Sequence, residues 1–190
     1  MVKVPTIQSK DVLFDIQLSL SGTKTCGRSL REAHYRLGKF LGAFIQQDMN
    51  ILNNRVTVLI LMRSGLMFGL GVADALEEKK KVNIHFLYEP NETVRIPETD
   101  KIVVVDGVIN TGETMRLILD KLDFKDIMIA CNVMSRNAVE VLEKENVYSI
   151  RISDHFFVGS NVNHISGQYG PDTGERLFNS SFYSDLDNID

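Results

Sequence analysis

Apolar residues form short continuous runs that alternate with stretches of helical spacing over most of the chain. Runs rich in Val, Ile and Leu occupy residues 56–62, 82–88, 101–106, 127–134 and 147–152. Between them, apolar residues recur every three or four positions at 65–80, 111–122 and 137–145. Continuous apolar runs are typical of strands that are buried on both faces. The pattern predicts an α/β fold with a largely parallel, twisted sheet and helices on both of its faces.

The first 50 residues carry two further patterns. Between Val12 and Leu20, apolar and polar residues alternate, and this period of two predicts a strand with one buried face. Further on, Ser29 and Glu32 have the Ser-x-x-Glu form of a capping box, and apolar residues at helical spacing follow them. We therefore expect an amphipathic helix that starts at Ser29 and ends near Gln47.

Length and charge exclude several classes of protein. A chain of 190 residues suits one domain over 1–190, and its net charge of -4 gives no general attraction to nucleic acid. The sequence lacks an apolar stretch of membrane-spanning length and a basic segment leading into an apolar run at its start, so we expect a cytoplasmic protein without membrane partners. Cys26 and Cys131 have no metal or disulfide spacing and are interpreted as buried free thiols.

The segment 102–115 carries the clearest candidate chemistry. A buried strand runs into Asp106, and a short loop follows before Thr111-Gly112-Glu113-Thr114 opens a helix. The start of a helix offers free N–H groups and the positive end of the helix dipole, while a carboxylate accepts hydrogen bonds from hydroxyl groups. This arrangement favours binding of a phosphate beside a polyol, as in a phosphorylated ribose.

This segment resembles the phosphoribosyl-pyrophosphate loop of type I phosphoribosyltransferases. Most members of that superfamily have two adjacent acids here, whereas the uracil phosphoribosyltransferases have one, as this chain does in Asp106-Gly107. Three other stretches are similar to that family in the same order: Leu-Met-Arg-Ser-Gly-Leu at 61–66, Asp154 after the strand-like run 148–153, and Gly-Pro-Asp-Thr-Gly-Glu-Arg-Leu-Phe at 170–178. Arg63, Asp106 and Asp154 each stand at the carboxyl end of a predicted strand, so we expect them to converge on one cleft if those strands are neighbours. The resemblance covers residues 23–178 and implies the type I phosphoribosyltransferase fold.

The resemblance also implies a reaction in pyrimidine salvage. Uracil would displace pyrophosphate from phosphoribosyl pyrophosphate, and uridine monophosphate would form. In this assignment Asp106 binds the ribose hydroxyls, Arg63 binds pyrophosphate, and Asp172 lies near pyrophosphate and its Mg²⁺, which binds mainly through the donor. Residues expected to contact the donor phosphates are Ser64, Gly65, Asn110, Thr111, Gly112, Glu113 and Thr114. Those expected near the base, mostly through their backbone, are Ile165, Gly167, Tyr169, Gly170 and Pro171.

Each of the three catalytic candidates also has a plainer interpretation. Asp106 could close a loop, Arg63 could be a surface arginine, and Asp172 could belong to an Asp-x-Gly turn. Among the histidines, His34 and His85 are interpreted as structural because they lie within a helix and a strand. The long polar segment 155–178, which contains several aromatic residues, is interpreted as a hood over the active site, and the segment 179–190, which has little to pack, as a mobile tail. A homodimer is also expected.

Two departures from the family keep other functions open. Glu89 stands where the family has an arginine that faces phosphate, and residues 166–171 differ from the family's base-binding loop. One alternative is a regulatory or sensor protein that binds phosphoribosyl pyrophosphate with little turnover. The other is a phosphoribosyltransferase for another nucleobase.

Overall fold

A six-stranded parallel sheet forms the centre of the molecule. The computed structural model describes all residues except 22, 50–54, 91, 93–94, 155–170 and 181–190. The sheet order is β1-β6-β5-β4-β2-β3, and every pairing is parallel. Its strands are β1 (Val2–Lys3), β2 (Arg55–Leu61), β3 (Lys81–Leu87), β4 (Lys101–Ile109), β5 (Ile127–Ser135) and β6 (Val147–Ser153). The predicted parallel sheet is confirmed.

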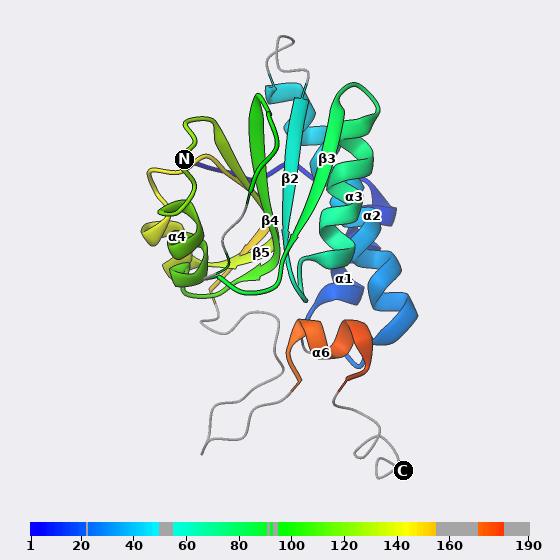
Figure 1. The fold of residues 1–190 in the computed structure, drawn as a ribbon. Coiled ribbons are helices and arrows are strands. Elements are labelled where there is room, and N and C mark those ends of the chain that lie inside the picture. The colour runs from blue at the N-terminus through cyan, green and yellow to red at the C-terminus, as the bar shows by residue number, and fades with distance from the viewer. Residues whose placement is uncertain (22, 50–54, 91, 93–94, 155–170, 181–190) are drawn as a thin grey trace.

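Helices cover both faces of this sheet (Figure 1). They are α1 (Lys10–Ser19), α2 (Gly27–Asp48), α3 (Leu66–Glu77), α4 (Glu113–Leu119), α5 (Arg136–Val141) and α6 (Thr173–Phe178). One core lies between the sheet and α2 and α3, where Phe68 and Val105 are fully buried. A second core lies on the opposite face, where Met115 of α4 packs with Ile129. Continuous apolar strands were therefore a correct sign of a sheet buried on both faces.

Close packing of α2 against α3 fixes the start of α3 over the sheet. A Cβ atom at Gly38 of α2 would lie 2.9 Å from the carbonyl carbon of Phe68 and would overlap its oxygen. At Gly71 of α3, a Cβ atom would overlap the carbonyl oxygen of Tyr35. Glycine at both positions lets the two backbones touch, so the loop between β2 and α3 has a fixed place.

The strand predicted over residues 12–20 is wrong, because this segment is helix α1. Ser9 caps the helix, and its hydroxyl accepts a hydrogen bond from the Val12 amide at 3.4 Å. The apolar side chains of Leu13 and Phe14 stay exposed, whereas the polar Asp15 is buried. An alternation of apolar residues thus misled the prediction, because the buried face of α1 is partly polar.

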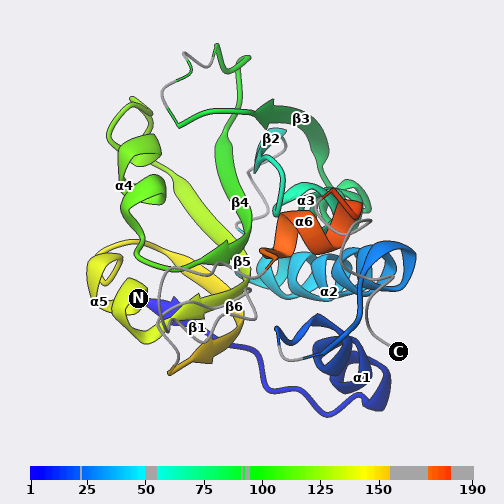
Figure 2. The ribbon, with the colours of Figure 1, turned by 90° about the horizontal axis from the view of Figure 1, so that it is seen from below.

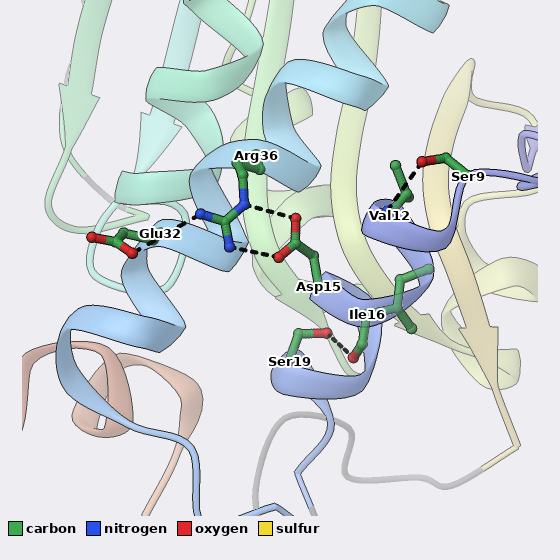
Figure 3. Close-up of polar contacts among 7 residues, drawn as sticks. All are labelled: Ser9, Val12, Asp15, Ile16, Ser19, Glu32 and Arg36. Carbon is green, nitrogen blue, oxygen red and sulfur yellow. Dashed lines mark hydrogen bonds and ion pairs between the residues drawn. The ribbon is translucent and has the colours of Figure 1, made fainter.

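Asp15 is buried because it pairs with α2. Its two carboxylate oxygens accept hydrogen bonds from Nε and Nη2 of Arg36 at 2.9 and 2.7 Å (Figure 3). Ser19, also on the inner face, donates its hydroxyl proton to the carbonyl of Ile16 at 2.8 Å. A buried charge is tolerated when it is paired and hydrogen-bonded. The polar contacts in Figure 3 therefore hold the inner face of α1 in place, where an amphipathic helix would usually carry apolar side chains.

The predicted capping box at the start of α2 is also wrong. The helix starts at Gly27, its N-cap residue is Cys26, and no side chain caps it. Glu32 instead accepts a hydrogen bond from Nε of Arg28 at 2.7 Å. The other end of α2 is Asp48, one residue beyond the predicted Gln47.

Residues 173–178 form helix α6 rather than the predicted hood loop. Asp172 is its N-cap, and a capping box joins Asp172 and Glu175. In Figure 2, α6 lies beside α2, and Arg31 of α2 donates a hydrogen bond to the carbonyl of Leu177 at 2.7 Å. Residues 155–170 of the expected hood and 181–190 of the expected tail lie outside the described residues.

Both cysteines are free thiols, as predicted. Cys131 is buried in the sheet, but Cys26 is half-exposed because it stands at the start of a helix, so its predicted burial is wrong. Among the described helices, none combines the length and the apolar character needed to cross a membrane.

Candidate functional site

The loop that follows β2 lies against β4 at the carboxyl ends of the strands. β2 and β4 are neighbours, with Leu59 opposite Val104 and Ile60 opposite Val105. Ser64 in the loop donates a hydrogen bond from its Oγ to Oδ1 of Asp106 in β4. The peptide between Met62 and Arg63 is cis. The fold thus brings the predicted pyrophosphate loop and the predicted ribose acid together.

Two glycines make this contact possible. A Cβ atom at Gly107 would lie 2.8 Å from the carbonyl carbon of Ser64 and would overlap its oxygen. At Gly65, a Cβ atom would lie 2.9 Å from the Val105 carbonyl oxygen and 3.2 Å from the Asp106 Cα atom. Side chains at these positions would push the loop away from the strand. Gly107, which stands where most of the superfamily has a second acid, is therefore required by packing.

Burial raises the pKa of Asp106 to about 6. Hydrogen bonds from Ser64 and from the backbone amides of Val108 and Gly107 oppose that rise, because they favour the charged carboxylate. The Val108 amide lies 3.4 Å from Oδ1 of Asp106. At neutral pH the side chain is mainly ionised and can accept hydrogen bonds from the hydroxyl groups of a ligand.

The predicted phosphate loop turns sharply before α4. Gly112 is the N-cap of α4 and has a φ of +82°, a left-handed conformation that favours glycine. The Thr111 hydroxyl accepts a hydrogen bond from the Glu113 amide at 3.3 Å, and Ser135 of β5 donates to the Asn110 carbonyl. Oδ1 of Asn110 is buried and has no hydrogen-bond partner among the described residues. The loop therefore presents a buried amide and the free N–H groups of a helix start.

Arg63 faces Asp172 across a large sequence separation. Their Nη2 and Oδ2 atoms lie 3.7 Å apart, and both side chains are more than half exposed, at 51% and 57%. Asp172 keeps its plainer role as well, because its Oδ1 accepts the Glu175 amide proton at 2.7 Å. Exposed ion pairs contribute little stability. Both side chains are thus available to a ligand at the rim of the site.

Asp154 stands apart from these groups. It follows β6, and β5 separates that strand from β4. Its carboxylate accepts a hydrogen bond from Nε of Arg136 at 2.6 Å. The predicted meeting of strand ends therefore holds for Arg63 and Asp106 but does not extend to Asp154.

A buried basic cluster was not predicted from the sequence. His34 of α2 is 1% exposed and lies close to Arg151 of β6 and Arg176 of α6. Burial, together with these two arginines, lowers the pKa of His34 to about 3. Both ring nitrogens of His34, Nε of Arg151 and Nη1 of Arg176 have no hydrogen-bond partner within the described part of the chain. The one sequence signal was Arg151 itself, a charge inside the apolar run 147–152.

Most residues predicted to contact the base lie outside the described residues. These are Ile165, Gly167, Tyr169 and Gly170. Pro171 is described and directly precedes Asp172, the N-cap of α6.

The parallel sheet, with an acid of β4 held against the loop after β2, defines the class of type I phosphoribosyltransferases. Residues 22–180 match the family described as uracil phosphoribosyltransferase, and the chain belongs to this family. It is thus a phosphoribosyltransferase by family and by fold.

Known structures agree with this fold. The protein AQ2163 from Aquifex aeolicus is 15% identical with a TM-score of 0.71, over 96% of this chain and all of that one. Orotate phosphoribosyltransferase from Mycobacterium tuberculosis, in complex with 5-phospho-alpha-D-ribosyl 1-diphosphate, is 14% identical with a TM-score of 0.51, over 77% of this chain and 91% of that one. No curated protein matches this chain.

Proposed function

We propose that the protein transfers the phosphoribosyl group of phosphoribosyl pyrophosphate to uracil and releases pyrophosphate. The main support is the position of Asp106, whose carboxylate is held against the loop of Arg63, Ser64 and Gly65 at the carboxyl ends of the strands. Ligands of open parallel sheets bind at these ends. Membership of the uracil phosphoribosyltransferase family favours uracil as the acceptor.

The chemical step needs charge stabilisation on both sides of the sugar. The bond from ribose C1 to the pyrophosphate oxygen breaks, a bond from C1 to N1 of uracil forms, and the N1 proton is lost. Positive charge spreads over the sugar ring in the transition state, as in other glycosyl displacements. Asp106 would orient the ribose hydroxyls and place negative charge near this cation, while Arg63 would bind the leaving pyrophosphate with its planar guanidinium.

The loop 110–114 would hold the 5-phosphate. The helix start offers backbone N–H groups, and the threonines at 111 and 114 add hydroxyls. α4 is short and starts only at Glu113, so these local amides matter more than a long helix dipole. Gly112 keeps the turn tight enough for a phosphate to approach the backbone.

Magnesium would enter with the donor. Mg²⁺ prefers a few protein oxygens together with substrate phosphates. The described residues contain no group of three or more His, Cys, Asp or Glu side chains that could hold an ion. Asp172 would supply a single carboxylate, since its Oδ2 faces Arg63, to which we assign the pyrophosphate. The bound ion would neutralise charge on the departing pyrophosphate.

A second candidate is transfer to a different, acidic base. Arg151 stands near the end of β6, just before the segment 155–170, and burial lowers its pKa. Its Nε has no hydrogen-bond partner among the residues that the structure describes. A half-buried guanidinium whose Nε has no hydrogen-bond partner among the described residues favours an anionic ligand such as the carboxylate of orotate.

A third candidate is a sensor that binds the donor with little turnover. Glu89 is exposed just beyond β3, whose last residue, Leu87, accepts a hydrogen bond from the Met62 amide at 2.9 Å. Because the end of β3 contacts the start of the pyrophosphate loop, an acid two residues beyond this contact would oppose binding of an anion there.

Two measurements separate these candidates. Calorimetry with phosphoribosyl pyrophosphate and Mg²⁺ tests donor binding, and pyrophosphate release is then followed with uracil, cytosine, orotate, hypoxanthine, guanine and adenine. Release with uracil alone supports the proposal, and release with orotate selects the acidic base. Binding without release selects the sensor, and absence of donor binding rejects all three.

A further inference from the structure

The side chain of Ser64 makes a contact of its own, in addition to any contact of its backbone amide with the donor phosphates. Its hydroxyl donates to Oδ1 of Asp106 and joins the pyrophosphate loop to the ribose acid. We propose that Ser64 is a positioning residue that fixes the Asp106 carboxylate, so that Oδ2 faces the ribose diol. This proposal rests on the proposed function, because it assumes that Asp106 binds ribose.

The backbone around Ser64 is held tightly enough for this role. On one side, its carbonyl lies against Gly107, where a Cβ atom would overlap it. On the other, Gly65 is in contact with Val105 and Asp106. A hydroxyl on a backbone fixed at both ends has few positions open to it. The fixed backbone holds the Cβ atom of Ser64 beside Asp106, and one of the three staggered positions of the hydroxyl then meets the carboxylate.

Other contacts of the carboxylate are weaker. The Val108 amide reaches Oδ1 only at 3.4 Å, a long hydrogen bond. Arg63, the charged residue of the same loop, pairs with Asp172. On the neighbouring strand, Cys131 of β5 is paired with Asp106 in register, and the Asp106 charge helps to raise the pKa of that thiol. Among the described residues, Ser64 is thus the side chain that orients Asp106 by a hydrogen bond.

Removal of the hydroxyl should affect both protonation and chemistry. The hydrogen bond from Ser64 lowers the pKa of Asp106 against the effect of burial. In Ser64→Ala, the carboxylate should therefore take up a proton at higher pH and also turn more freely. The acid limb of the kcat profile should move to higher pH, and kcat at its plateau should fall roughly tenfold, the value of one hydrogen bond. The KM for uracil should change little.

The test is a pH titration of the free protein by NMR of the side-chain carboxyl carbons, in which Asp106→Asn identifies the Asp106 signal. Ser64→Ala should raise the pKa of this signal. Ser64→Thr, which keeps the hydroxyl, should restore the wild-type value, while Ser64→Cys, with a weaker donor, should behave like Ser64→Ala. Ser19→Ala is the matched control, because it removes a buried serine hydroxyl in α1 that donates to the Ile16 carbonyl and not to Asp106. It should leave the titration and kcat unchanged.

An unchanged titration in folded Ser64→Ala and Ser64→Cys would overturn the proposal, as would a raised pKa without a shift of the kcat profile. If Ser64→Ala does not fold, the comparison of Ser64→Cys with Ser64→Thr decides. The titration needs no substrate. Failure of the wild-type protein to bind the donor would reject the proposed function, while the titration would still decide whether Ser64 fixes Asp106.

Discussion

The Asp106 carboxylate is partly buried, and burial raises its pKa from 3.8 to about 6. Between these values the folded state holds a proton that the unfolded state has lost. Folding stability therefore falls as the pH rises through this window, and above pH 6 the ionised carboxylate destabilises the fold. The charge remains useful because it places a hydrogen-bond acceptor beside the expected ribose.

Asp106→Asn should separate these two effects. The variant should lose turnover by at least about 100-fold, because the amide provides no negative charge near the sugar cation. At pH 7.5 its free energy of unfolding should exceed that of the wild type by about 1–3 kcal/mol, since one pKa unit corresponds to about 1.4 kcal/mol. Urea unfolding at pH 7.5 and pH 4 checks this, because the gain should vanish at the lower pH. Normal turnover or lower stability at pH 7.5 would contradict the assignment.

Arg63→Ala should weaken donor binding with little effect on folding. Loss of a guanidinium bound to pyrophosphate should raise the Kd for phosphoribosyl pyrophosphate with Mg²⁺ by about 10- to 100-fold. The unfolding free energy should barely move, because the Arg63–Asp172 pair is exposed. Calorimetry measures the Kd, and Arg28→Ala, which removes another exposed arginine with an acidic partner, serves as control. Equal affinity in Arg63→Ala and Arg28→Ala would remove Arg63 from the donor site.

For single residues, the sequence is sufficient when all the residues of a motif lie within one short segment. Asp106 and Gly112 lie in one short segment, and the roles proposed for them follow from the residue types and order of that segment. The contact of Ser64 with Asp106 could not be predicted, because it depends on the pairing of β2 with β4 and on two glycines that let backbones touch. The neighbours of His34 were hidden for the same reason, since they come from β6 and α6.

Among the helices, α1 depends on one ion pair. Asp15→Ala should lower the free energy of unfolding by about 1.5–3 kcal/mol, because it removes two charge-assisted hydrogen bonds to Arg36. Urea unfolding measures this loss, and hydrogen exchange should show faster opening of α1 than of α3. Asp11→Ala removes an exposed acid from the same helix and should change stability far less. Equal effects of the two substitutions would show that the pair does not hold α1 in place.

Helices and strands whose apolar residues follow a clear pattern could be predicted from the sequence, whereas helices held by polar contacts could not. β2, β4 and β5 were found within a few residues of their bounds because buried strands need continuous apolar side chains. α1 was mistaken for a strand because its inner face carries Asp15 and Ser19. α6 was missed because it is short and its start is set by the Asp172 capping box, a signal that also fits a turn.

Over the whole molecule, α6 is joined to the rest of the chain through Arg176. Its Nη2 donates hydrogen bonds to the carbonyls of Leu20 and Thr25, each at 3.0 Å, and its charge lies close to His34. His34 also lies close to Arg151, so its ring must stay neutral for these elements to pack together. Protonation of His34 would add a third positive charge to a buried cluster of two.

This arrangement predicts how the protein unfolds in acid. The pKa of His34 is lowered from 6.5 to about 3, so the unfolded state takes up a proton that the folded state does not. Above pH 6.5 His34 is neutral in both states, and the buried ring costs the fold nothing in proton binding. As the pH falls from 6.5 toward 3, the free energy of unfolding decreases. At pH 4 the loss should be about 3 kcal/mol relative to pH 8.

His34→Leu should therefore flatten the acid dependence of unfolding. At pH 8 the variant should be at least as stable as the wild type, because leucine removes two buried nitrogens that have no partner among the described residues. Urea unfolding between pH 4 and pH 8 measures both effects. His85→Leu, on the partly exposed edge strand β3, is the matched control and should keep the wild-type slope. If His34→Leu loses stability toward pH 4 as steeply as the wild type does, groups other than His34 cause the acid sensitivity.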